Sequence, residues 1–169
     1  MRLIIAFIAT LALAIFPARA DTKLIHAGTL FAVPGQEPLK EQTLVVRDGR
    51  IAEVKAGYVL GSPGERVIDL RTKYVLPGLI DCHVHILGEL SAKSKVERVE
   101  ESEAFDALRG ATYALRTLRA GFTTVRDLGT GLGFSDVALQ RAIDNGWVIG
   151  PRLIPAGHAI STTGGHCDL

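Results

Sequence analysis

The sequence predicts an α/β fold in which a small β-rich segment precedes the first units of a parallel sheet covered by helices. Residues 21–75 alternate between short apolar runs and turn residues, as half-buried strands do. After Pro77-Gly78 the period of the apolar residues lengthens to that of helices. Strand-like and helix-like segments then recur about every 30 residues, which is typical of right-handed βαβ units.

Residues 1–20 resemble a secretory signal peptide. The segment has a positive start at Arg2, an uncharged apolar stretch over Leu3–Phe16 and small residues at its end. That apolar stretch is shorter than the ~20 residues that a spanning helix needs. We therefore expect cleavage near Ala20 and export to the periplasm or the medium, without a stable membrane anchor.

The charge balance gives no indication of a polyanionic partner. Loss of Arg2 and Arg19 from the 19 basic residues leaves them almost equal to the 18 acidic ones, a net charge of about −1. We therefore expect neither nucleic acid nor an anionic membrane as partner. Cys82 and Cys167 are the only cysteines. Export would allow a disulfide between them, but without a framework spacing free thiols are the preferred reading.

Residues 21–75 predict a small antiparallel sheet, a β-rich part of a sandwich domain. The runs KLIHAG, TLFAVPG and TLVVRDGRIAEVKAG supply its strands. In the last run, Asp48-Gly49 stands between two apolar-rich stretches, which is the strongest short-range signal for a hairpin.

Residues 76–169 predict three strands and two helices. The expected strands are LIDCHVHI (79–86), FTTVRDLG (122–129) and PRLIPAGHAIS (151–161). The expected helices cover 103–121, ending at Gly121, and 135–146, capped by Ser135 and ending at Gly146. The first helix has an apolar face formed by Phe105, Leu108, Ala111, Thr112, Leu115 and Leu118.

The first of these strands, residues 79–86, contains the main candidate site residues. Because side chains alternate along a strand, three polar residues share one face and three less polar residues the other. The polar face carries Asp81, His83 and His85. The other face carries Cys82, Val84 and Ile86. In a parallel α/β barrel the apolar set packs beneath helices and the inward set lines the active site at the C-terminal strand end.

Two imidazoles directed into a barrel need partners, because burying unpaired polar groups is costly. Neutral histidine is a good ligand for zinc and similar divalent cations. The pattern therefore predicts His83 and His85 as metal ligands. Asp81 is expected to hold other inward groups by hydrogen bonds. Structural histidines are the alternative.

Four further residues are candidates for contact with substrate or for orienting other groups. His166 follows a glycine turn after the third strand, where it either meets substrate at the barrel mouth or is incidental, and Asp168 could orient it. Arg126 and Asp127 end the second strand. They either pair with neighbouring charges or place a charge near the site, where Arg126 could meet a substrate carboxylate.

Two other features are expected to be without function. Residues 129–136 follow a strand and precede a helix, as a phosphate-binding loop would. However, the third glycine position of that motif falls on Phe134 and no lysine follows. We therefore expect no nucleotide site, and we expect His26 to lie on the surface.

Four stretches together resemble the metal-dependent amidohydrolase superfamily: VVRDGRIAEV, LPGLIDCHVH, GFTTVRDLG and GPRLIPAGHAISTTGGHCD. GPR followed by STTGGH is similar to the imidazolonepropionase-like and Xaa-Pro dipeptidase-like group. The resemblance covers the chain from about residue 23 onward. It implies a TIM-like (β/α)8 barrel whose first strand supplies two metal ligands, matching His83 and His85. It also implies one or two divalent metals, usually zinc.

In that family the remaining ligands are a carboxylated lysine and two histidines on later strands, and an aspartate on the eighth strand shuttles the proton. A metal-bound hydroxide attacks an amide, ester or similar carbonyl. These later residues have no counterpart here, because an eight-unit barrel needs about 250 residues and residues 76–169 supply roughly three strands. The sequence therefore predicts an incomplete barrel with no assigned catalytic residue, inactive by itself, from a truncated product or gene fragment.

For the parent protein we expect an exported metal-dependent amidohydrolase that cleaves a dipeptide or an N-acyl amino acid. Lactones, cyclic amides and organophosphates are alternative substrates, and the metal stays open among zinc, manganese, cobalt and iron. The alternative of another class is a non-catalytic remnant or a small binding module with structural histidines. The sequence gives no indication of oligomeric state.

Overall fold

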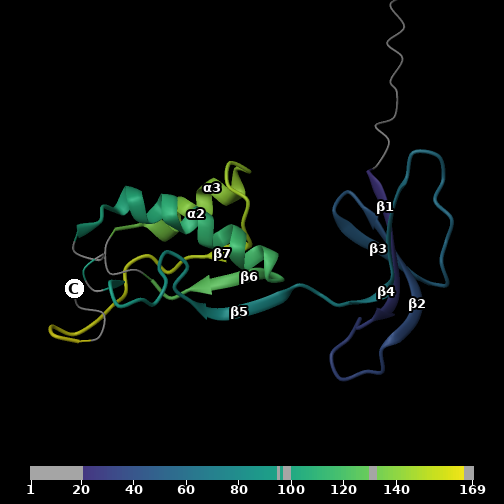
Figure 1. The fold of residues 1–169 in the computed structure, drawn as a ribbon, viewed down its shortest axis with the longest axis horizontal. Helices are drawn as coiled ribbons and strands as arrows, with labels where there is room; N and C mark the ends of the chain where they lie inside the picture. Colours follow the sequence, from purple (N-terminus) through teal and green to yellow (C-terminus); the bar gives the residue numbers. More distant parts are fainter. Residues whose placement is uncertain (1–20, 95, 97–99, 130–132, 166–169) are drawn as a thin grey trace, which may run out of the picture. The chain divides into compact units, whose positions relative to one another are not determined.

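The computed structural model describes residues 21–94, 96, 100–129 and 133–165 (Figure 1). The chain divides into two compact units, with the division between Leu76 and Pro77. The first unit contributes strands and the second contributes strands and helices, which gives the predicted α/β fold. The predicted signal peptide and Cys167 lie outside the described residues. Among the described residues, no helix has the length and apolar character needed to cross a membrane.

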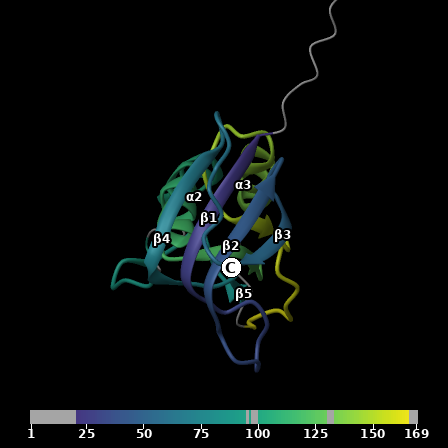
Figure 2. The same ribbon diagram turned by 90° about the vertical axis from the view of Figure 1, so that its right-hand side faces the viewer.

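The first unit is a four-stranded sheet with the order β3-β2-β1-β4 (Figure 2). Its strands are β1 (Thr22–Leu30), β2 (Leu39–Arg47), β3 (Arg50–Ala56) and β4 (Arg66–Val75). The pairs β1–β2 and β2–β3 are antiparallel as predicted, but β1 pairs parallel with β4, so the sheet is mixed and the prediction is wrong for β4. The connection after β3 brings the chain back to the far side of β1, where β4 runs in the same direction as β1 and adds a parallel edge.

The hairpin between β2 and β3 confirms the turn predicted at Asp48-Gly49. Both residues have positive φ, 49° and 76°, and Arg47 pairs with Arg50 across the turn. A two-residue turn with two left-handed residues matches the twist of the flanking strands, and Asp-Gly adopts it readily. Local turn chemistry therefore sets the register of this strand pair.

Buried polar side chains in the first unit hold the segment that follows β3. Thr43 is fully buried; its Oγ1 donates to the Gly57 carbonyl (2.7 Å) and accepts from the Val59 amide (3.0 Å). His26 is also buried, with Nε2 2.9 Å from the Val59 carbonyl and its ring beside Tyr58. The expectation of a surface position for His26 is therefore wrong, because the returning segment covers it.

The second unit is a parallel sheet with both helices on one face, as Figure 1 shows. Its elements are β5 (Leu79–Val84), α2 (Glu103–Arg119), β6 (Phe122–Asp127), α3 (Ser135–Asp144) and β7 (Arg152–Ile154). The strands follow the order β5-β6-β7, which confirms the predicted βαβ series. β7 is shorter than expected because Pro151 and Pro155 flank it, and a proline has no amide hydrogen for the ladder.

The buried face of α2 differs from the apolar face seen in the sequence. Gly110 and Ala114 are buried, whereas Leu108 is 73% exposed and Phe105 53% exposed. A Cβ at Gly110 would lie 2.6 Å from the Leu87 side chain, so the absence of a side chain lets the helix approach closely. The core beneath the helices consists of Ile86, Leu87, Ala114, Val125, Leu139 and Leu153. Small residues therefore determine how α2 packs.

The helix ends follow the predictions with one exception. Gly121 and Gly146 have φ of 99° and 72° just after α2 and α3, as expected for C-terminal glycines. Ser135 does not cap α3, because Phe134 occupies the cap position. The Ser135 hydroxyl instead donates to the Glu103 carbonyl (2.9 Å), which joins the starts of α3 and α2.

Candidate functional site

The two predicted metal ligands lie next to each other at the C-terminal end of β5. His83 is the next-to-last residue of the strand and His85 directly follows its last residue, and both are exposed. Their ring centroids are 5.6 Å apart with the ring planes at 76°. Val84 and Ile86, which alternate with them, pack in the core beneath the helices. The structure therefore brings the two imidazoles together, away from the residues that pack under the helices.

A bulge in β5 lies between Asp81 and Val84 and includes His83, the first of the two histidines. Asp81 pairs with Val125 and Val84 pairs with Asp127, so three steps on β5 face two steps on β6. The Asp81 carboxylate accepts a hydrogen bond from the His83 amide (2.9 Å). The strict alternation expected from Asp81 to Ile86 is interrupted here, because a bulge shifts the faces of the residues before it.

Two residues depart from the expected faces as a result. Asp81 lines a shallow hollow together with Val84 and with Thr117 of α2. Cys82, expected on the helix side, is exposed and is a free thiol. The Asp81 carboxylate thus holds the backbone amide of His83, two residues further along the strand.

Asp127, at the end of β6, is fully buried near His85. Its Oδ2 accepts from the Ile86 amide (2.7 Å) and its Oδ1 from the Gly129 amide (2.8 Å). The Gly129 carbonyl lies 3.2 Å from Nδ1 of His85. Burial raises the pKa of the Asp127 carboxyl above its ordinary value, and the two backbone donors oppose that shift.

Asp136, in the first turn of α3, is a second fully buried carboxylate. Its two oxygens accept from the amides of Val137 and Gly157, each at 2.8 Å. Its negative charge also raises the pKa of Asp127. The two aspartates together bond the backbone that follows β5, β6 and β7, the edge where the histidines lie.

The sequence contained a signal for Asp127 that the prediction did not use. Asp127 lies two residues after Val125, a core residue, and therefore on the same face of β6. A carboxylate on a helix-covered face needs hydrogen-bond donors. Asp136 has no such signal in the sequence, since an acidic residue in the first turn of a helix is usual.

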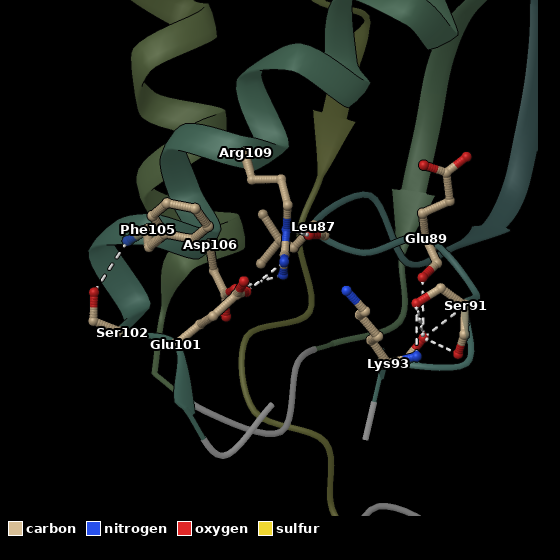
Figure 3. A network of polar contacts seen from close by, with 10 residues as sticks. Leu87, Glu89, Ser91, Lys93, Glu101, Ser102, Phe105, Asp106 and Arg109 are labelled. Atoms are coloured by element: carbon tan, nitrogen blue, oxygen red, sulfur yellow. Dashed lines mark hydrogen bonds and ion pairs between the residues drawn. The ribbon is translucent and has the colours of Figure 1, made fainter. Parts of the chain in front are cut away.

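The loop after His85 is anchored to α2 by Arg109, as Figure 3 shows. Its Nε donates to the Leu87 carbonyl (3.2 Å), and the guanidinium also pairs with Glu101 and, at 2.7 Å, with Asp106. Burial raises the pKa of Asp106, while the charge of Arg109 opposes the shift. The contacts fix the first residues of the loop that leaves the histidine strand.

Of the other predicted site residues, only Arg126 lies within the described part of the chain. Arg126 is exposed on β6, the strand next to the histidines, and alternates with the buried Val125 and Asp127. The glycine turn before His166 is present, with the Gly165 amide bonded to the Thr162 carbonyl (2.8 Å). His166 and Asp168 themselves lie outside the described residues.

The pair of histidines fits part of a metal site. Two adjacent, accessible imidazoles are suitable ligands for a divalent cation. Within residues 21–165, apart from the gaps in the described ranges, no three histidine, cysteine or acidic side chains are grouped to hold a metal ion. A closed site therefore requires donors in addition to His83 and His85.

Known relatives match the chain over most of its length. It is similar to ochratoxinase of Aspergillus niger, with 32% identity over 158 residues that cover 89% of this chain and 31% of the relative. It is also similar to imidazolonepropionase of Klebsiella pneumoniae strain 342, with 33% identity over 149 residues that cover 70% of this chain and 36% of the relative.

Solved structures also match the chain over most of its length. A Xaa-Pro dipeptidase with bound methionine matches with a TM-score of 0.80 and 36% identity, over 87% of this chain and 36% of that one. The Aspergillus niger ochratoxinase structure matches with a TM-score of 0.72 and 28% identity, over 89% and 34%. The chain thus spans about a third of the length of these relatives.

The amidohydrolase family model matches residues 74–168, more than half of the chain. Enzymes of this superfamily generally use divalent metals, and the matched part of the neighbouring structures is the N-terminal part of their barrels. The resemblance drawn from the histidine strand and the three other stretches is therefore confirmed, and the chain belongs to the amidohydrolase family.

Proposed function

We propose that the protein carrying this chain is an exported, metal-dependent hydrolase that cleaves an amide bond in a peptide-like small molecule. One observation carries the proposal: two accessible imidazoles, His83 and His85, lie side by side at the C-terminal end of the first strand of a parallel α/β unit. That edge is where active sites of such barrels are built. Membership of the amidohydrolase family supports the reaction type.

The residues of this chain have separate tasks in such a site. His83 and His85 would bind a divalent cation, and zinc is the proposed metal, because neutral imidazoles suit it. When bound, the cation supplies an activated water at neutral pH and polarises the carbonyl of the substrate. Arg126, exposed on the neighbouring strand, offers a positive charge for a substrate carboxylate. We assign no proton-transfer residue among the described residues.

A dipeptide or an N-acyl amino acid is the proposed substrate class. The structural neighbours include a Xaa-Pro dipeptidase and a prolidase complexed with N-methylphosphonate-L-proline. Dipeptides and N-acyl amino acids both carry a free carboxylate on the residue whose nitrogen forms the amide bond. The exposed guanidinium of Arg126 is suited to that carboxylate, since arginine pairs with it through two parallel hydrogen bonds.

The proposal is tested on the whole protein that carries this chain. We expect bound divalent metal and hydrolysis of members of a dipeptide and N-acyl amino acid panel. Replacing His83 or His85 with alanine should lower metal content and reduce kcat/KM by roughly 100-fold or more, since loss even of groups that support ligands costs 10–100-fold. His158→Ala is the matched control, because that imidazole packs edge-on against the Phe134 ring instead of joining the histidine pair. The centroids of these two rings are 4.5 Å apart.

Two results would contradict the proposal. The first is full hydrolysis by the His83→Ala and His85→Ala variants, which would make both histidines structural. The second is a metal-free protein that hydrolyses nothing on the panel, which would favour the non-catalytic binding module. The 169-residue chain alone should hydrolyse none of these substrates, because two imidazoles without further ligands bind a cation only weakly and leave the catalytic site incomplete.

A further inference from the structure

The C-terminal edge of the parallel sheet contains a continuous path of hydrogen bonds that ends on one of the two imidazoles. We propose that Asp127 is a positioning residue that sets the orientation and the tautomer of His85, acting through Gly129. The purpose of this arrangement, presenting Nε2 to a metal, rests on the proposed function. The hydrogen-bonded path itself does not depend on that function.

Gly129 is bonded on both of its polar groups. Its amide donates to Asp127 Oδ1 (2.8 Å), and its carbonyl lies 3.2 Å from His85 Nδ1. Asp127 is fully buried and belongs to β6, so its own position is fixed by the sheet and by the core around Val125. The carboxylate therefore determines where the Gly129 carbonyl meets the imidazole.

The chemistry of the carbonyl determines the tautomer of His85. A carbonyl oxygen only accepts hydrogen bonds, so the contact requires the proton of a neutral imidazole to be on Nδ1. Nε2 then carries the free lone pair, which is the state a metal needs. Orientation of a ligand histidine by a bond from its other nitrogen is the general role of groups around metal sites.

The same carboxylate also fixes the backbone on the other side of His85. Asp127 Oδ2 accepts from the amide of Ile86, the next residue in the chain, at 2.7 Å. Both partners of Asp127 are donors, so both oxygens must accept. An asparagine has one acceptor and one donor group, so it can satisfy only one of the two amides.

Asp136 offers a matched comparison. It is equally buried and also accepts two backbone amides, but these belong to Val137 and Gly157 and not to the path that reaches His85. Asp136→Asn therefore removes a buried carboxylate of the same kind with the same loss of one acceptor. A specific effect on His85 should follow only from Asp127→Asn.

The test reads the histidine tautomers in the metal-free 169-residue chain by long-range ¹⁵N–¹H correlation at pH 8, where an unperturbed imidazole is neutral. His85 should carry its proton on Nδ1 in the wild type. Asp127→Asn should move His85 toward the Nε2–H form, while Asp136→Asn should leave it unchanged. His83 is an internal control, since its contact with Asp81 uses the backbone amide and not the ring.

If Asp127→Asn fails to fold, measurements on the wild type still test the proposal. Scalar couplings across the hydrogen bonds should connect the Asp127 carboxyl carbon with the amides of Ile86 and Gly129. An Nε2–H tautomer on His85 in the wild type, or absence of both couplings, would overturn the proposal. So would an equal tautomer shift in Asp127→Asn and Asp136→Asn. None of these readouts depends on hydrolysis, so the proposed function can fail while this inference holds.

Discussion

The two units of the chain bury polar side chains of different kinds. In the first unit the buried groups are mainly a hydroxyl and an imidazole, those of Thr43 and His26, and both bond the backbone of residues 57–59. In the second unit they include the carboxylates of Asp127 and Asp136, whose four oxygens all accept backbone amides.

The difference shows where the chain tolerates a costly group. Burial of a carboxylate costs far more than burial of a hydroxyl, and it is tolerated only where strong donors meet each oxygen. The first unit uses the less costly solution to attach a connecting segment. The second uses the costly one at the edge of the sheet that carries His83 and His85, where the backbone must be placed accurately.

The largest expected effect comes from breaking the core of the second unit alone. Leu139 is 2% exposed and packs against the underside of α2, so Leu139→Ala should lower the free energy of unfolding of this unit by about 2–5 kcal/mol. Hydrogen exchange of β5 and β6 amides measures the loss. Leu108→Ala, at a position that is 73% exposed, should change it by less than about 0.5 kcal/mol. Equal losses would show that the buried face of α2 is wrongly assigned.

The corresponding change in the first unit should have a smaller effect. Thr43→Val keeps the volume but leaves the Gly57 carbonyl and the Val59 amide without their partner, at a cost of about 1–3 kcal/mol. Faster exchange of the Val59 amide would report the loss directly. Thr72→Val, at an exposed position, is the control. An unchanged Val59 amide in Thr43→Val would contradict the role assigned to the hydroxyl.

The smallest expected effect concerns an exposed pair on β4 and depends on pH. Arg71 hydrogen-bonds Asp69 and lowers the pKa of its carboxyl from 3.8 to about 2. Folding therefore favours the ionised form, so the stabilisation is present above pH 3.8 and disappears as the pH falls through about 2. Asp69→Asn should remove this part of the acid dependence of unfolding.

Because both side chains of that pair are exposed, the difference should be small and should shrink further at high salt. Acid titrations of the wild type and Asp69→Asn, at low and high ionic strength, provide the check. A difference between the two proteins that persists at high salt would mean that the pair is less accessible than the structure indicates.

Much of the fold followed from local sequence signals. The Asp48-Gly49 turn, the two helices with their terminal glycines and the parallel order of three strands depend on neighbouring residues, and the structure confirms them. The parallel edge strand β4 was missed because pairing between β1 and β4 is a long-range contact. The buried face of α2 was missed because Gly110 packs by having no side chain, which an apolar pattern does not record.

The pair of histidines in the candidate site was predicted from the sequence, but the roles of the neighbouring aspartates were not. The juxtaposition of His83 and His85 follows from their spacing of two residues near the end of a strand. The displacement of Asp81 depends on a bulge, and the contact between Asp127 and Ile86 joins residues 41 positions apart. Such contacts are determined by the assembled sheet, so the roles of Asp81 and Asp127 required the structure.

The most direct test of the whole account is a zinc titration of the 169-residue chain, followed through the imidazole resonances of its histidines. We expect His83 and His85 to shift together with one midpoint, while His26, buried against Val59, does not shift. His85→Ala should abolish the shift of His83. Independent midpoints for the two rings, or no shift of either at millimolar zinc, would contradict a shared cation site at the end of β5.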